Sequence, residues 1–216
     1  MPVGATLYRT QFTAFFQNSL IAAITFLFIF FSTQAHAFEP QDIPVVGLAF
    51  LTNLSIHEVG HYIMADQAGA EGNSLNFFKR EQGSFFFGLS TVTNIDDKAK
   101  PSYHLAGEVA SSYTFEMALK RYRDMDSTYN RALMFFSMTD FLWYTTYAFY
   151  LSPHQNDKYD PIGISNTTGI SRDTIFLVAL TQSSLNAIRI YTRQDMFIPY
   201  FSIDKYFIGF NVRVPF

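Results

Sequence analysis

The sequence predicts a mainly α-helical, polytopic membrane protein with three to four apolar helices and a small β-hairpin or edge-strand element. Of the 216 residues, 49% are hydrophobic and 18% aromatic, while only 15% are charged. An ordinary soluble domain carries about 25% charged residues, so this composition indicates contact with lipid. The apolar helices are predicted from long apolar segments at residues 45–64, 103–122, 131–151 and 174–191.

Residues 1–37 are predicted to be a signal peptide or a first transmembrane helix. Arg9 precedes an apolar run at residues 20–31, which is shorter than the roughly 20 residues that a spanning helix needs. Ala35, His36 and Ala37 follow, and small-x-small is the pattern before a signal-peptidase cleavage site. We prefer cleavage after Ala37, and the alternative is an uncleaved helix over residues 15–33. In both cases residues 38–216 form one membrane domain.

Two β elements are predicted. The segment SLNFFKREQGSFFFGLSTVTN, residues 74–94, is rich in Phe and Thr and has Gly83 near its centre, which is typical of a β-hairpin. Apolar residues alternate along residues 206–216, as they do in the last strand of outer-membrane proteins. We expect this tail to form an edge strand that pairs with the Phe-rich hairpin.

Charge and cysteine content exclude several classes of function. The formal net charge of −3 gives no basis for binding nucleic acid. The chain has no cysteine, so it can form neither disulfides nor thiolate zinc sites. Any metal must be held by histidine and carboxylate side chains.

An HExxH motif, His57 to His61, lies inside the first of these apolar segments. Residues four apart share one helix face, so His57 and His61 can bind one ion, with ring nitrogens about 3–4 Å apart. In such motifs the glutamate, here Glu58, holds the metal-bound water and takes its proton. Zinc suits this chemistry. Buried polar groups without partners would cost several kcal/mol in an apolar helix, so the two histidines need partners. The alternative to a metal is a pair of buried histidines hydrogen-bonded to carbonyl groups.

A third metal ligand is needed, and six residues are considered for it: Asp160, Asp157, Asp140, Glu108, His104 and His154. Asp160 ranks first because it begins DPIGIS, a rigid turn that can present a carboxylate at a helix end. Asp140 lies inside an apolar segment, where an acid is costly unless it pairs or ligates. Glu108 would give a zincin of the HExxH…E type. The two histidines rank lowest, because a lone loop histidine is more often solvated.

Three segments, HEVGHYIMADQAGAEGNSLNFF, FFFGLSTV and HLAGEVASSY, resemble the site-2 protease family of intramembrane metalloproteases. That family has HExxH on one transmembrane helix, then a β-hairpin, then a small-residue segment opening the next helix. A later Asp-Gly motif supplies its third zinc ligand. Here Asp160-Pro161 is the nearest equivalent, and Ser111 stands where the family usually has asparagine.

The resemblance implies a zinc-dependent membrane endopeptidase that cleaves peptides or membrane proteins by metal-activated water. It implies Zn²⁺ bound by His57, His61 and Asp160, Glu58 as the catalytic base, and contact with membrane lipid. Together with the export signal or anchor in residues 1–37, it leads us to expect a place in the membrane of a bacterial cell envelope, the inner membrane in particular. Three alternatives remain open. They are a non-proteolytic membrane protein that retains a metal-binding HExxH helix, a zincin that uses Glu108, and a structural protein of the envelope.

Overall fold

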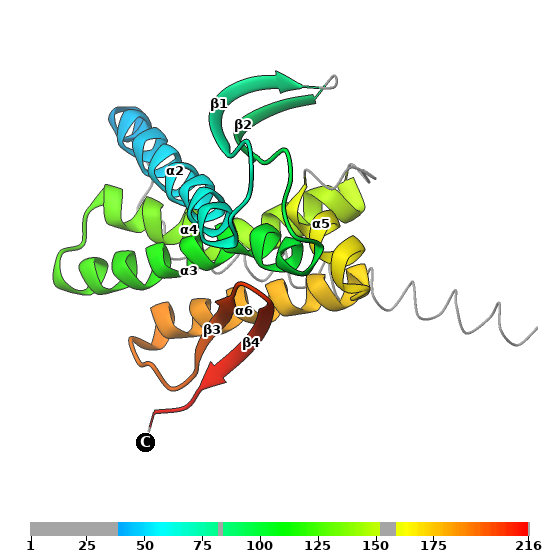
Figure 1. Ribbon diagram of the computed structural model, residues 1–216. Coiled ribbons are helices and arrows are strands. Elements are labelled where there is room, and N and C mark those ends of the chain that lie inside the picture. Colours follow the sequence, from blue (N-terminus) through cyan, green and yellow to red (C-terminus); the bar gives the residue numbers. More distant parts are fainter. Residues whose placement is uncertain (1–38, 82–83, 152–158, 216) are drawn as a thin grey trace, which may run out of the picture. The chain divides into compact units, whose positions relative to one another are not determined.

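Five α-helices and two β-hairpins make up residues 39–81, 84–151 and 159–215, which are the residues that the computed structural model describes (Figure 1). The helices are α2 (Ile43–Ala68), α3 (Lys100–Asp124), α4 (Thr128–Thr146), α5 (Asp160–Thr168) and α6 (Arg172–Thr192). The strands are β1 (Ser74–Glu81), β2 (Ser84–Thr91), β3 (Ile198–Asp204) and β4 (Phe207–Arg213). Short 3-10 turns, Pro40–Asp42 and Asp97–Ala99, precede α2 and α3, and a π-helical turn, Tyr147–Leu151, extends α4. The predicted cleavage after Ala37 lies outside the described residues.

Helix α2 buries one face and exposes the other. Pro44 lies in the first turn of the helix, where proline is tolerated, and the helix ends where Gly69 adopts a left-handed φ of 71°. Most of the buried residues recur about every four positions along the helix, close to the helical period: Ala49, Asn53, His57, His61, Ala65 and Ala68. Gly60 permits close approach of α3, because a Cβ there would contact the Ala106 carbonyl and the Ala110 side chain.

Helix α3 is the central element around the site, since it contacts α2, α4, α5 and both strands of the C-terminal hairpin. Pro101 lies in its first turn, where the missing N–H costs nothing. Ser127 precedes helix α4, and its side chain caps the helix by accepting a hydrogen bond from the Asn130 N–H. Helices α2, α3 and α4 therefore pack together as one group, and α5 joins them through α3.

The two hairpins form separate two-stranded sheets. Strands β1 and β2 pair antiparallel from Ser74 opposite Thr91 to Glu81 opposite Ser84, which confirms the predicted Phe-rich hairpin. The predicted pairing of the C-terminal strand is wrong. Strand β4 pairs with β3, with Ile198 opposite Arg213, and not with the Phe-rich hairpin. The reason is local: β3 directly precedes β4, and Tyr206 closes a tight turn onto Asp204.

The predicted polytopic membrane architecture is wrong. Among the described residues only one helical stretch, Pro40–Ala68, is long and apolar enough to cross a membrane. The other helices bury polar side chains between them, such as Glu108 on α3 and Arg189 on α6, so their apolar residues serve a protein core. Only 22% of the most apolar part of this stretch is buried inside the protein. A single helix of this kind is weak evidence for a membrane location.

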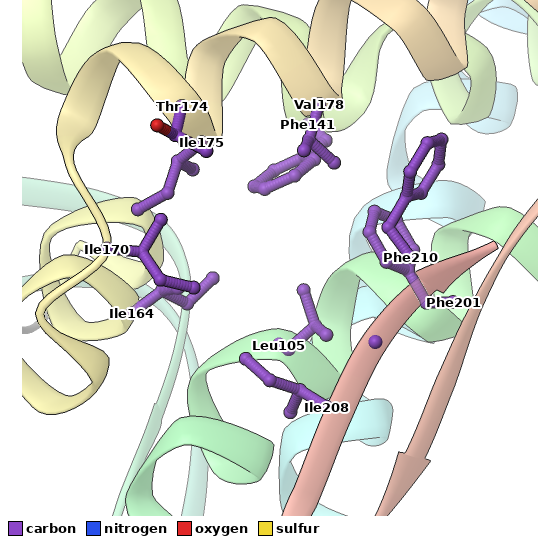
Figure 2. A pocket seen from close by; sticks show the side chains of 11 residues that line it. Leu105, Phe141, Ile164, Ile170, Thr174, Ile175, Val178, Phe201, Ile208 and Phe210 are labelled. Carbon is purple, nitrogen blue, oxygen red and sulfur yellow. The ribbon is translucent and has the colours of Figure 1, made fainter.

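An apolar cavity of about 120 Å³ lies between the C-terminal hairpin and the helices α3, α4, α5 and α6 (Figure 2). Leu105, Phe141, Ile164 and Phe201 are among its lining residues, and Thr174 supplies the one polar side chain of the lining. Ile164 lies on α5, so the cavity adjoins the helix that carries Asp160.

Replacing Phe201 with alanine is expected to lower the free energy of unfolding by about 3–5 kcal/mol. Its ring is buried and packs on Phe141 and Phe210, with centroid distances of 5.6 and 5.5 Å. Urea denaturation measures the change. Tyr200→Ala is the matched control, because Tyr200 neighbours Phe201 on the same strand but is 44% exposed. Equal losses of stability in the two variants would contradict this description of the core.

Candidate metal centre

His57 and His61 point the same ring atom at a common space. Both side chains are buried on α2, and their Nε2 atoms lie 3.1 Å apart. This separation agrees with the 3–4 Å that the helical spacing predicts.

Asp160 completes a triangle with the two histidines. Its Oδ2 lies 3.3 Å from His57 Nε2 and 3.1 Å from His61 Nε2. A tetrahedral zinc ion with bonds of about 2.0–2.1 Å requires ligand atoms about 3.3 Å apart. The three atoms therefore have the spacing of a metal site, and the group is buried.

Local sequence places Asp160 at the start of α5. Pro161 follows it and suits the first turn of a helix, where its fixed φ is already helical. A carboxylate at a helix N-terminus is also stabilised by the helix dipole. Burial disfavours the ionised form of Asp160, but the three neighbouring histidines outweigh burial and hold the pKa of Asp160 well below its usual range. Asp160 is therefore an anion at neutral pH.

The outer nitrogens of both histidines have partners of their own. His57 Nδ1 lies 2.7 Å from Asp140 Oδ2, and His61 Nδ1 lies 2.6 Å from the Tyr103 carbonyl oxygen. Both oxygens are acceptors, so each Nδ1 carries the hydrogen and donates it. Metal-binding histidines are held in this way by a carboxylate or a carbonyl group.

This tautomer leaves three lone pairs facing one another. With hydrogen on Nδ1, the Nε2 atoms of His57 and His61 present lone pairs to each other and to Asp160 Oδ2. Such an arrangement of neutral rings is repulsive in a buried site unless a metal ion or a proton on Nε2 lies between the three atoms. Burial lowers the pKa of both histidines, but the neighbouring Asp140 and Asp160 carboxylates outweigh burial and raise the pKa of His57 and of His61 above the usual range. The geometry thus fits a metal ion by the chemistry of its own side chains.

Asp140 belongs to the surroundings of the site and not to the triangle. Its Oδ2 accepts hydrogen bonds from His57 and from Ser111 Oγ, the latter at 2.7 Å. Ser111 therefore orients the carboxylate that orients His57. Of the six candidate third ligands, the structure brings Asp160 to both histidines, while Asp157 and His154 lie outside the described residues.

Glu108 groups with His57 and Asp140, not with His61 and Asp160. Its side chain is 1% exposed, and neither carboxylate oxygen has a hydrogen-bond partner among the described residues. Burial, and then the neighbouring Asp140 carboxylate, raise the pKa of Glu108 well above its usual range. The raised pKa favours the neutral form of Glu108. Because Glu108 also does not group with His61, it is a poor candidate for the third ligand of an HExxH…E site.

Glu58 is buried beneath the first hairpin. Its Oε2 accepts a hydrogen bond from the Ser90 backbone N–H of β2 at 2.7 Å. Gly88 makes this approach possible, because a Cβ at Gly88 would overlap the Glu58 side chain. The Tyr103 hydroxyl donates to the Ser90 carbonyl at 2.8 Å and so ties the same strand to α3. The hairpin thus fixes the orientation of Glu58 beside the two histidines.

Gly107 on α3 is expected to be essential for metal binding. A Cβ at this position would overlap the Nε2 atoms of both His57 and His61. Gly107→Ala should therefore lower zinc affinity by at least about 10-fold, as loss of a ligand-orienting group does. Equilibrium dialysis with zinc measures it. Gly47→Ala is the control, because nothing lies within 4 Å of its Cβ position, and unchanged affinity in Gly107→Ala would contradict this geometry.

Several residues of the site escape prediction from the sequence. The Tyr103 carbonyl and the Ser90 N–H are backbone groups, which leave no trace in residue types. Gly88 and Gly107 are glycines within regular elements, a weak signal that another group approaches closely. His104, which ranks low as a ligand from the sequence, is buried on α3 with its Nδ1 3.7 Å from Asp160 Oδ1.

Comparison of this chain with protein-family models, curated proteins and solved structures found no match.

Proposed function

We propose that the protein is a zinc-dependent endopeptidase whose zinc ion is bound by His57, His61 and Asp160. The observation that carries the proposal is the buried triangle of His57 Nε2, His61 Nε2 and Asp160 Oδ2 beside Glu58. Two imidazoles and one carboxylate leave a fourth position for water, which is the ligand count of catalytic zinc sites. Resemblance of the motif order to the site-2 proteases supports the same conclusion.

Zinc is the proposed metal because of the donor set. Imidazole nitrogen and carboxylate oxygen at tetrahedral spacing suit Zn²⁺, whereas Mg²⁺ and Ca²⁺ prefer six or more oxygen ligands. When bound, zinc supplies a Lewis acid and a water whose pKa is lowered to about 7. The ionised Asp160 and the Asp140–His57 hydrogen bond both increase the electron density that the site offers to the ion.

Glu58 is the proposed general base. It follows His57 directly on α2, and its burial beside the two histidines keeps the carboxylate at the site. Glu58 would take a proton from the attacking water and pass it to the amine that leaves when the peptide bond breaks. The hydrogen bond from Ser90 N–H occupies Oε2, so Oε1 is the oxygen available for this transfer.

Peptide is the proposed substrate class because a strand edge passes over Glu58. The N–H and C=O of Ser90 bond to Glu58 and Tyr103, so they point away from β1. Backbone groups alternate in direction along an antiparallel strand, and those of Gly88 therefore point to the same side. The groups of Ser90 are already bonded, so an extended peptide would pair with this edge at Gly88 and lie beside the site as an additional strand.

Membrane-associated peptides or proteins are the proposed natural substrates, and the membrane of a bacterial cell envelope, the inner membrane in particular, is the proposed location. Support comes from the exposed face of α2, which carries large apolar side chains such as Leu48, Leu51, Tyr62 and Ile63 at 41–58% exposure. This face is available to contact lipid. Flotation of the full-length protein with liposomes tests the location.

Hydrolysis of a fluorogenic peptide library by the purified protein tests the function. We expect cleavage that a chelator abolishes and that added zinc restores. A folded protein that binds zinc but cleaves no peptide would contradict the proposed activity and favour a non-proteolytic metal-binding protein.

A further inference from the structure

The structure assigns a role to His104 that the HExxH motif does not contain. We infer that His104 is a positioning residue for Asp160. His104 donates an Nδ1–H hydrogen bond to Oδ1 of Asp160, and this bond turns Oδ2 of Asp160 towards the metal. The inference rests on the proposed metal site and extends it to the third ligand.

The geometry around Asp160 carries the first step. Oδ2 faces both Nε2 atoms of the triangle, whereas Oδ1 faces His104 Nδ1 at 3.7 Å. This distance is just beyond hydrogen-bond length. A small rotation of the carboxylate as Oδ2 meets a metal ion would close it.

The second step is that His104 Nδ1 has no other partner. The ring is 8% exposed, and Nδ1 is a buried atom without a hydrogen bond among the described residues. Leaving a buried polar atom without a partner costs about 1–3 kcal/mol, so the unpaired Nδ1 indicates a functional role for His104. Asp160 Oδ1, at 3.7 Å, is the carboxylate oxygen that faces this Nδ1.

The third step concerns the space that His104 occupies. Gly163, three residues after Asp160 on α5, lies directly against the ring, and a Cβ there would overlap Nδ1, Cγ and Cε1. The glycine therefore allows the imidazole to reach the start of α5. The Tyr103 ring packs edge-on against His104, with a centroid distance of 5.4 Å.

These contacts give every residue of the triangle an outer partner. Asp140 holds His57, the Tyr103 carbonyl holds His61, and His104 holds Asp160. Tyr103 and His104 are adjacent on α3, so one turn of this helix orients two of the three ligands. Loss of such outer partners lowers metal affinity by about 10–100-fold in zinc proteins.

Two variants of His104 test the role. His104→Leu has a similar volume but no donor, whereas His104→Asn keeps an N–H close to the position of Nδ1. We expect His104→Leu to lower zinc affinity by about 10–100-fold and to change the visible absorption spectrum of the cobalt(II)-loaded protein. His104→Asn should restore most of the affinity and the wild-type spectrum. Competition with a chromophoric chelator measures zinc affinity without reference to activity.

Gly163→Ala is an independent variant from the opposite side of the contact. It displaces His104 without removing its donor, and it too should weaken zinc binding. Thermal melts of the metal-free proteins verify that each variant is folded. Wild-type affinity and spectrum in a folded His104→Leu would overturn the inference, as would His104→Asn behaving like His104→Leu. Wild-type protein that binds no metal would instead overturn the proposed function.

Discussion

Replacing Glu58 with glutamine is expected to lower kcat/KM for peptide hydrolysis by about 10²–10⁴-fold, because it removes the general base. Zinc content should not change, since Glu58 is not a ligand. The fold should also persist, because the glutamine carbonyl oxygen can accept the same hydrogen bond from Ser90 N–H. Steady-state kinetics together with metal analysis of the same preparation measure both effects.

Glu71→Gln is the control for this substitution. It makes the same chemical change on an exposed side chain, in the loop before β1. The control should keep the wild-type rate. Full hydrolysis by Glu58→Gln at wild-type zinc content would show that another group takes the proton.

Replacing Asp160 with alanine is expected to weaken zinc binding by more than about 100-fold, which exceeds the loss caused by removing an outer partner. The substitution removes one of three protein ligands and the one negative charge at the triangle. Hydrolysis should be lost with the metal. Competition with a chromophoric chelator measures the affinity.

Asp66→Ala is the matched control, because Asp66 is an exposed carboxylate on α2 itself. It should bind zinc as tightly as wild type. If Asp160→Ala retained wild-type affinity while His57→Ala lost it, a different acid would have to be the third ligand.

The metal-binding pair is predictable from the sequence because its geometry is local. Residues four apart on a helix necessarily share a face, so the motif alone brings His57 and His61 together. The sequence ranks Asp160 first but cannot place it, because Asp160 lies 99 residues after His61. Its rank depends on the turn-forming Asp-Pro sequence, and that turn is the start of α5.

The outer partners are beyond sequence reasoning, because they depend on tertiary contacts. Asp140 stands out in the sequence as a costly acid in an apolar segment, and this cost is met by His57 and Ser111 in place of a metal. His104 ranks low as a lone histidine, whereas α3 buries it next to Asp160. In each case the residue type signals a polar partner, but only the packing of α3 identifies which one.

The sequence overestimates the membrane architecture because composition does not distinguish lipid-facing from core-facing side chains. Phe141 and Phe201 are buried against each other inside the protein, yet they contribute to average hydropathy as lipid contacts would. Apolar segments that also carry a buried Glu108 or Arg189 belong to a protein core, where Arg189 bonds to Glu116.

X-ray absorption at the zinc edge of the zinc-loaded wild-type protein decides whether the metal centre exists as proposed. We expect bound zinc with a coordination shell of nitrogen and oxygen at about 2.0–2.1 Å and more distant scattering from two imidazole rings. Asp160→Ala should alter that shell or lose the ion. A folded protein that binds no zinc, or a zinc shell without imidazole, would contradict the claim that His57, His61 and Asp160 form a metal centre.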